Sequence, residues 1–427
     1  MPYVVILLVG ASVLLLLSVP IFLSLLLPSI VAFSVSDLGL PLVALPQRAV
    51  QGVNVFALLA IPMFIFAADV ISRGEIGNRL VDVADSLVGH IPGGLAISTA
   101  LTMAVFGAIS GIGVAAVVSV GPIVYPALIR QGYSKRFSIG LILSGSTLSM
   151  LIPPSVAVIL YCLQTGQSIA KVFLSAFGAG LVFLVLLIAY SLVYALRRGI
   201  GRAQHFSASA LLKALKRGGW ALMLPVIILG GIYSGYFTVT EAAAVSAVYA
   251  MFVEVCVYRR LKLRELLDVT STSAATIAML LILIAAGSIM TWFMTVQQVP
   301  QMIAGLIGSG SAESLLLIVN VIFLIAGMVI DPNSAIIVLA PLIFPAAMAV
   351  GIDPVHLGAV LTLNLAIGMI SPPFGINLFV GIVTFKSHFA EVVRGCFPFL
   401  ILALVALALV TYIPSLIMWL PELSSVR

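Results

Sequence analysis

The sequence predicts an all-α protein that crosses a membrane many times, and three observations carry this prediction. Of 427 residues, 62% are hydrophobic and only 8% are charged, too few polar groups to cover a water-soluble domain of this size. Apolar stretches long enough to cross about 30 Å of hydrocarbon recur along the chain, for example at 176–196 and 397–420. The alternating pattern of membrane β-barrel strands is absent. Because backbone groups in lipid must be paired within the span, we expect a bundle of helices.

The net charge of +6 follows from the position of the basic residues and does not indicate a nucleic-acid partner. Lys and Arg gather in four short clusters, at 130–136, 197–217, 259–264 and 386–394. Basic loops stay on the cytoplasmic side of a membrane protein. We therefore place all four clusters in the cytoplasm, and the chain must leave and return between successive clusters.

Apolar segments between the clusters define the spans. Two out-and-back pairs are expected, 138–161 with 172–196 and 219–237 with 240–258. The N-terminal stretch 3–35 fits either one long tilted helix or two short helices broken at Pro20. The side of the N-terminus stays open.

The last interval between clusters predicts a re-entrant hairpin. One exit at 272–292 and one return at 357–381 already balance the topology. The apolar segment 314–350 must therefore enter and leave by the same face, with its tip near Asp331–Ser334. Irregular backbone at this depth requires surrounding protein or a water-filled cavity.

The two halves of the chain form an internal repeat. Pro122 and Pro341 lie 219 positions apart, and so do similar six-residue segments around them, 121–126 and 340–345. The same offset, without a gap, pairs Pro126 with Pro345, Gly132 with Gly351, Met150 with Met369, Pro153-Pro154 with Pro372-Pro373, and Leu87–Gly89 with Leu306–Gly308. Proline and glycine matches at one fixed offset are improbable by chance.

The loops show that the repeat is inverted. The connector 130–136 is basic and cytoplasmic, whereas its counterpart Gly351–His356 contains Asp353 and no Lys or Arg, and so lies outside. Inverted repeats are typical of secondary transporters. By symmetry, the first half should hold its own hairpin, entering from the cytoplasm with its tip at Gly107–Gly113.

Four stretches combine helix-breaking residues with hydroxyl or amide groups at membrane depth. They are the hairpin tips Gly107–Gly113 and Asp331–Ala335 and the broken helices Ser149–Ser155 and Ser371–Asn377. A Pro-Pro pair removes two amide donors and frees carbonyls upstream, which suit a hard cation such as Na⁺. The helix starts that follow favour anions. This chemistry fits a sodium-coupled organic-anion carrier, although Gly and Pro also serve close helix packing.

Asp331 is the most informative single residue. A carboxylate deep in a span costs about 2.5–3.5 kcal/mol, so we expect it to have a partner, and a coupling ion is one candidate. The alternative is a helix cap before Pro332 at shallow depth. Asp69 and Glu254 fall near span ends, and we expect both to be interfacial.

Enzyme motifs are missing from the sequence. There is no H-E-x-x-H, P-loop or nucleophile elbow, and no soluble region is long enough for a nucleotide-binding domain. We therefore predict that the chain is not an enzyme or an ATP-driven pump.

At these positions the chain resembles the large permease subunit of tripartite ATP-independent periplasmic (TRAP) transporters, of the DctM/SiaM type. The resemblance spans nearly the whole chain in order. The matching segments are Phe56–Phe64, Gly107–Ala115, Ile152–Ser155, Phe237–Ala243, Asp331-Pro332 and Ser371–Phe379.

The resemblance implies an elevator, in which a mobile transport domain moves against a scaffold. On this basis we divide the chain into an N-terminal scaffold segment (1–53), the first repeat (54–170), connecting scaffold helices (171–272), the inverted second repeat (273–390) and a C-terminal span (391–427). The location implied is the bacterial inner membrane.

The resemblance also implies the site and the partners. Na⁺ is the coupling ion, in two or more copies. One ion would be held by Ser110, Gly111 and Pro153, and another by Asp331, Asn364 and Pro372. The substrate, an organic acid such as a C4-dicarboxylate, sialic acid or another sugar acid, would lie near Ser110, Gly111, Ser155, Ser371 and Asn377. A four-helix membrane subunit (DctQ type) and a periplasmic binding protein (DctP type) would complete the system.

Two other interpretations stay open. The first is a stand-alone sodium–dicarboxylate elevator carrier that needs no binding protein. The second is a different class, an ion channel or a membrane-embedded enzyme.

Overall fold

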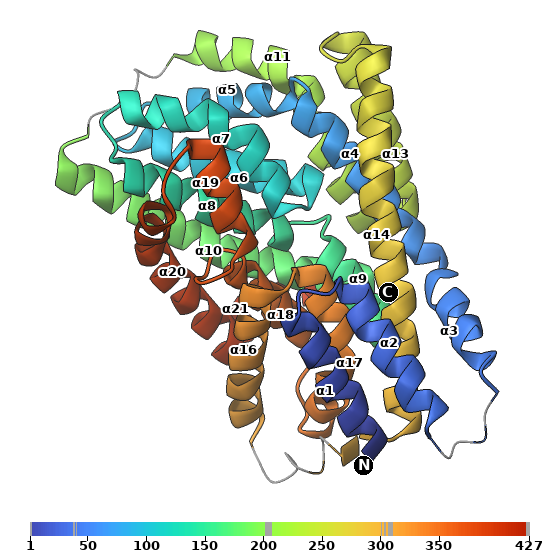
Figure 1. Cartoon of the computed structure of the whole chain (residues 1–427). Helices are drawn as coiled ribbons and strands as arrows, with labels where there is room; N and C mark the ends of the chain where they lie inside the picture. The colour runs from blue at the N-terminus through green and yellow to red at the C-terminus, as the bar shows by residue number, and fades with distance from the viewer. Residues whose placement is uncertain are drawn as a thin grey trace.

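The computed structural model describes residues 2–36, 39, 41–200, 207–299, 301–302, 305 and 311–423 (Figure 1). These ranges consist of helices, turns and short loops and contain no strand. Ten helices within them are long and apolar enough to cross a membrane. The all-α class is therefore confirmed.

The helices follow one another with short connections. In the first half they are α1 (Pro2–Leu16), α2 (Ile21–Ser34), α3 (Ala44–Val53), the 3-10 turn η1 (Phe56–Leu59), α4 (Ala60–Arg73), α5 (Ile76–Val88), α6 (Gly94–Ser110), α7 (Gly113–Arg130), α8 (Lys135–Leu151), α9 (Val156–Thr165) and α10 (Ile169–Arg198). The connecting helices are α11 (Ala208–Pro225), the π-helical η2 (Val226–Gly230), α12 (Gly231–Tyr233), α13 (Val239–Phe252) and the π-helical η3 (Val253–Val257). The second half contains α14 (Leu263–Val296), α16 (Ala312–Val329), α17 (Pro332–Ala349), α18 (Pro354–Gly368), α19 (Ile376–Phe385), α20 (Phe389–Tyr412) and α21 (Ser415–Leu423).

Helix bounds repeat at the offset found in the sequence. Helices α7 and α17 begin 219 positions apart, at Gly113 and Pro332, and end 219 positions apart as well. Helices α8 and α18 begin at the same offset. Each is followed by a break that contains two prolines joined by a cis peptide bond. The proposed match at Leu306–Gly308 lies outside the described residues.

The two helix pairs that form hairpins sit at opposite ends of the molecule. Figure 1 shows α6 and α7 in the upper half, near α5 and the basic helix α11, and α16 and α17 in the lower half. Helix α11 carries Lys213, Lys216 and Arg217, so the upper end is the one predicted to be cytoplasmic. The arrangement fits hairpins that enter from opposite faces.

The N-terminal stretch forms two short helices. Helices α1 and α2, of 15 and 14 residues, measure about 22 and 21 Å at 1.5 Å per residue, less than the roughly 30 Å of hydrocarbon. They pack against each other, on either side of a turn at Leu17–Pro20. The alternative of two helices broken at Pro20 is therefore correct, and the turn reaches into the molecule.

Glycines bring each hairpin against the helix that leads into a break. A Cβ atom on Gly107 of α6 would lie 2.6 Å from the Cα of Ser149 in α8. A Cβ on Gly368 of α18 would lie 2.5 Å from the Cα of Gly327 in α16. No larger residue fits at such separations, so the interrupted backbone is covered by direct helix-to-helix contact.

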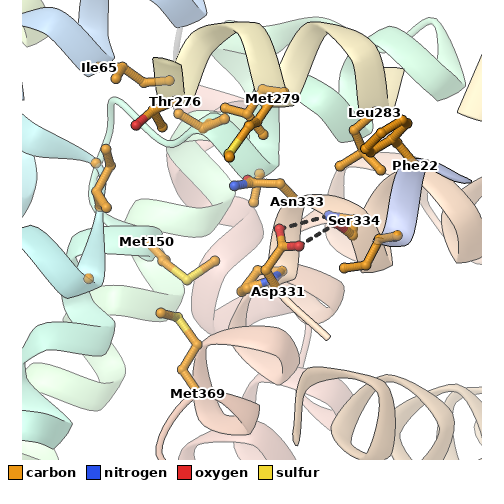
Figure 2. Close-up of a pocket in the computed structure, with 18 of the residues that line it drawn as sticks. Phe22, Ile65, Met150, Thr276, Met279, Leu283, Asp331, Asn333, Ser334 and Met369 are labelled. Atoms are coloured by element: carbon orange, nitrogen blue, oxygen red, sulfur yellow. Dashed lines mark hydrogen bonds between the residues drawn. The ribbon is translucent and has the colours of Figure 1, made fainter. Parts of the chain in front are cut away.

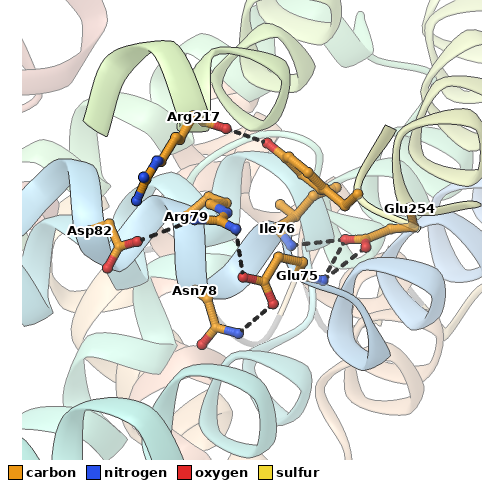
Figure 3. Close-up of polar contacts among 8 residues, drawn as sticks. Glu75, Ile76, Asn78, Arg79, Asp82, Arg217 and Glu254 are labelled. Atoms are coloured by element: carbon orange, nitrogen blue, oxygen red, sulfur yellow. Dashed lines mark hydrogen bonds and ion pairs between the residues drawn. The ribbon is translucent and has the colours of Figure 1, made fainter. Parts of the chain in front are cut away.

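Glu254 lies near the end of its span, as expected, and its side chain is fully buried within the protein. Its carboxylate accepts hydrogen bonds from the backbone amides of Glu75 (2.9 and 2.8 Å) and Ile76 (2.8 Å) at the start of α5 (Figure 3). A side chain at Gly74 would collide with this carboxylate. Asp69 is half-buried and accepts a bond from the Ser273 hydroxyl at 2.6 Å.

Glu254 therefore ties η3, which continues α13, to the junction between α4 and α5. Helix α5 is amphipathic and leads into the first hairpin arm, α6. Around its first turns, Arg79 pairs with Glu75 at 3.1 Å and with Asp82 at 3.8 Å. The charge of Glu254 meets free amide donors at a helix N-terminus, where an anion is favoured.

The Glu254→Gln variant should lower the thermal stability of the protein in detergent. The amide keeps the size of the carboxylate but places an NH₂ group against backbone donors, and a lost hydrogen bond to a charged group costs about 1.5–3 kcal/mol. Glu241→Gln on the same helix is the control, because Glu241 is exposed in a capping box with Thr238. Equal unfolding temperatures for the two variants would contradict this role of Glu254.

Candidate functional site

The two hairpin tips meet at one cavity of about 450 Å³ (Figure 2). From the tips it is lined by Gly111, Ile112, Gly113, Asp331, Pro332, Asn333 and Ser334, and from the broken helices by Met150, Val156, Ala157 and Met369. Its remaining wall is formed by Pro20, Ile21 and Phe22 of the N-terminal pair, Ile65 of α4, and Thr276, Met279, Leu280 and Leu283 of α14. Segments more than 200 residues apart thus come together here.

Asp331 is the N-cap of α17. Its Oδ2 accepts a hydrogen bond from the backbone amide of Ser334 at 3.0 Å, and its Oδ1 accepts one from the Ser334 hydroxyl. The capping alternative therefore describes its contacts. Asp331 is nevertheless half-buried at the cavity wall, and each carboxylate oxygen retains a lone pair for another partner.

Asn364 hydrogen-bonds to α16, the first arm of the second hairpin. Its buried side chain donates to Asn320 Oδ1 at 2.7 Å, and Asn320 donates to Thr411 Oγ1 at 3.1 Å. The next residue, Leu365, packs against Gly327, since a Cβ on Gly327 would lie 3.2 Å from the Leu365 Cα. Asn364 Oδ1 has no hydrogen-bond partner among the described residues, and its place in the second sodium set stays a prediction.

The first tip and the first break do come together. Gly111 has a φ of +64°, and a Cβ there would collide with the Pro154 carbonyl oxygen. Ser110 and Ser155 flank this contact and are fully buried. Ser155 also caps α9 through the amide of Val158 at 3.5 Å. Ser110, Gly111, Pro153 and Ser155 thus form one neighbourhood, as predicted.

Asn377 connects the two halves. Its Nδ2 donates to Ser146 Oγ at 2.8 Å, and its backbone amide donates to the Met369 carbonyl at 3.0 Å. A Cβ on Gly113 would lie 3.1 Å from the Ser146 carbonyl and 3.4 Å from Asn377 Nδ2. Ser146 was not predicted from the sequence. The hydroxyl residues that cluster at 144–149 could have indicated it.

Most of the predicted substrate residues do not line the cavity but are buried next to residues that do. Gly111 lines the cavity, whereas Ser110, Ser155, Ser371 and Asn377 are fully buried and are not among its lining residues. Ser371 donates its hydroxyl to the Ile367 carbonyl at 2.8 Å, within its own helix. At the second break, Met369 rather than Ser371 faces the space.

Several buried oxygen atoms near the breaks can accept a further hydrogen bond or bind a cation. Among the described residues, Ser149 Oγ, Asn364 Oδ1 and Asn377 Oδ1 have no hydrogen-bond partner within the chain. The prolines at 153 and 154 also leave the Ser149 and Met150 carbonyls without their amide donors four residues on. Buried acceptors of this kind normally find a partner, and a cation or a donor group of a ligand would provide one.

The cavity wall combines a large apolar area with few polar groups. Three methionines, Met150, Met279 and Met369, contribute flexible thioether side chains. Asp331 is the one ionisable side chain among the described lining residues. Figure 2 shows Asp331 and Asn333 between two sides of the cavity, with Met150 and Met369 on one side and Thr276 and Met279 on the other. Such a cavity suits a small organic solute with a few polar groups.

Comparison with known proteins agrees with this architecture. Residues 8–416 match the family described as the tripartite ATP-independent periplasmic transporter, DctM component. The ectoine TRAP transporter large permease of Halomonas elongata is 38% identical over 414 residues, 96% of this chain and 97% of that protein. The C4-dicarboxylate TRAP large permease of Pseudomonas aeruginosa is 39% identical over 369 residues, 86% of each chain.

A solved structure shares the fold. The YdaH transporter of Alcanivorax borkumensis superposes with a TM-score of 0.68, covering 96% of this chain and 99% of that chain at 14% identity. With the match over residues 8–416 and relatives close to 40% identity, the assignment no longer depends on motifs alone. This multi-pass membrane protein belongs to the TRAP transporter family, in which it is a large permease subunit of the DctM type.

Proposed function

We propose that this chain is the permease through which a sodium gradient drives the import of a small carboxylate-bearing solute across the bacterial inner membrane. The observation that carries the proposal is the cavity enclosed by the tips of two repeat-related hairpins. Solute sites of inverted-repeat transporters lie near the bilayer midplane, at interrupted helices. The cavity volume of about 450 Å³ falls in the range of small-molecule sites.

Its relatives indicate the class of solute. They are named for ectoine, C4-dicarboxylates and, in Escherichia coli, 2,3-diketo-L-gulonate, the last at 34% identity over 375 residues. These compounds carry a carboxylate, whereas isethionate, after which another relative is named, carries a sulfonate, so the feature they share is an acidic group on a small organic molecule. Sialic acid and other sugar acids belong to the same broad class.

Sodium coupling is supported by the oxygen atoms around the breaks. The first site would use Ser110, Gly111 and the carbonyls upstream of Pro153, where Ser149 Oγ has no hydrogen-bond partner among the residues that the structure describes. The second would use the break around Pro372. Asp331 and Asn364 would complete its ligand set, since Asn364 Oδ1 has no hydrogen-bond partner among the described residues. A hard monovalent cation prefers such oxygen ligands.

The composition of the cavity wall supports an elevator movement. One wall consists of α2, α4 and α14, and the other consists of hairpin tips and broken helices. Helix α14 has 34 residues, so it is about 50 Å long and exceeds the bilayer core. We propose that the hairpins and broken helices carry the solute along this long helix.

Two partners complete the proposal. A periplasmic binding protein would deliver the solute, and a small membrane subunit would support the scaffold. The isethionate TRAP permease of Oleidesulfovibrio alaskensis, 35% identical over 384 residues, carries the name DctMQ, and this chain covers 60% of it. That name joins the M component with a Q component in one chain.

The decisive experiment is uptake into proteoliposomes. The permease, its small subunit and the binding protein are reconstituted with a sodium gradient, and accumulation of labelled ectoine and of labelled succinate is measured. Collapse of the gradient should abolish accumulation of the transported solute, and omission of the binding protein should reduce it to background. Accumulation without the binding protein would favour the stand-alone carrier, and accumulation without sodium would contradict the coupling.

Gly111→Ala should abolish this uptake. The added Cβ collides with the Pro154 carbonyl oxygen, and so it separates the first tip from the first break. Gly132→Ala is the matched control, because Gly132 also has a positive φ (+94°) but a Cβ added there would meet no atom within 4 Å. Both variants bear the left-handed backbone cost of about 1 kcal/mol. Similar uptake by both would show that the contact is dispensable.

A further inference from the structure

We infer that the cavity selects an acid whose carbon body is an apolar ring or chain over an acid whose body carries several hydroxyl groups, as in sugar acids. The inference rests on the proposed transport function and narrows its substrate class. It comes from the side chains that would surround the body of a bound solute, and from how few of their polar groups are free to bind one.

Apolar side chains from several elements surround the cavity. Met150 and Met369 lie on one side and Met279 on the other (Figure 2). Phe22 of α2 and Val156 of α9 extend this apolar surface. Thioether side chains are flexible and adapt to apolar bodies of different shape. The wall can therefore contact an apolar ring closely and remove its surface from water, which is favourable.

The polar side chains of the wall are few, and most of their donors are already bonded. Among the described lining residues they are Thr276, Asp331, Asn333 and Ser334. The Thr276 hydroxyl donates to the Thr272 carbonyl at 3.3 Å, and the Ser334 hydroxyl donates to Asp331. An ionised carboxylate only accepts. This leaves the amide of Asn333 as the side-chain donor available to a ligand among the four.

A body with several hydroxyl groups is poorly matched to this wall. Each hydroxyl gives up hydrogen bonds to water when it enters the cavity and needs a partner there. The free polar groups, Asn333 and the remaining lone pairs of Asp331, lie at the second tip. Hydroxyl groups that point towards Met150, Met279 or the rest of the apolar wall would have no such partner. An apolar body meets no such cost.

The acidic group does not decide between the two classes of solute. Wherever it lies, the sodium ions proposed beside the breaks and the carboxylate of Asp331 act alike on two solutes that carry the same single carboxylate. A comparison at equal charge therefore isolates the contribution of the carbon body.

The test compares two probes that share one ring and one carboxylate. Cyclohexanecarboxylate has an apolar ring, whereas quinate carries hydroxyl groups on the same ring. The permease and its small subunit are reconstituted in nanodiscs with sodium and without the binding protein. Thr276, an exposed lining residue, is changed to Cys in a chain that carries Cys256→Ala, because Cys256 is also exposed. The rate of alkylation is measured as the concentration of each probe is raised.

Cyclohexanecarboxylate should halve the alkylation rate at a concentration at least about tenfold below that of quinate, since one unpaired buried hydroxyl is sufficient for a difference of this size. Thr272→Cys in the same background is the matched control. Thr272 is exposed one turn earlier on α14 and is not among the lining residues, so neither probe should slow its alkylation.

Met279→Gln provides the second arm. Met279 lines the cavity and is 72% exposed, so the change adds a donor and an acceptor to the wall without repacking the interior. The preference for cyclohexanecarboxylate should fall about fivefold, because a hydroxyl of quinate gains a partner. Met223→Gln on α11 is the matched control, since Met223 is also exposed (46%) and is not among the lining residues. It should leave the preference unchanged.

Four results would overturn the inference. They are protection by quinate at an equal or lower concentration, protection by neither probe, equal slowing of alkylation in the Thr272→Cys and Thr276→Cys variants, and a preference that Met279→Gln leaves at its full size. The expected protection in a permease that shows no sodium-driven uptake in liposomes would instead refute the proposed transport function and leave the selectivity of the cavity standing.

Discussion

The structure depends on keeping backbone groups paired where helices are interrupted inside the membrane. Each unpaired amide or carbonyl in lipid costs several kcal/mol, so an interruption survives only when protein or water covers it. Here the interruptions cover one another. Gly107 rests on Ser149 and Gly327 on Gly368, at separations where a side chain would collide. The hairpins thus provide the enclosure that the two proline breaks require.

The same constraint determines where a solute can bind. Interrupted helices expose new N-termini, and burying the interruptions together brings those N-termini to one cavity, which Gly113, Val156 and Pro332 all line. The wall opposite is made of uninterrupted helix, chiefly α14. The hairpin side of the cavity, rich in backbone polar groups, therefore faces a largely apolar wall. The elevator movement proposed above would disrupt few hydrogen bonds as one side slides along the other.

Local signals made much of this predictable. Proline, glycine and basic residues act through nearby backbone and loops, so the offset of 219 located both tips and both breaks, and helix bounds follow it closely. Contacts between distant segments were not predictable. Glu254 accepts hydrogen bonds from amides 179 and 178 positions away, and Asn364 donates to Asn320, 44 positions away. The sequence around Pro20 fitted one long helix as well as two short helices. Only the packing of α1 against α2, which the sequence does not show, decides for two helices.

Duplication gives the two halves similar backbones, and divergence at matched positions gives them different chemistry. Met150 and Met369 remain equivalent and line the cavity from both breaks. Ile112 and Asp331 also line the cavity and are related by the offset, but one side chain is apolar and the other is a carboxylate. Asn377 corresponds to Val158 and reaches across to Ser146 in the other half. A fully symmetric cavity would present like groups at both ends. Because the tips differ, the two ends of the cavity present different chemical groups to a ligand.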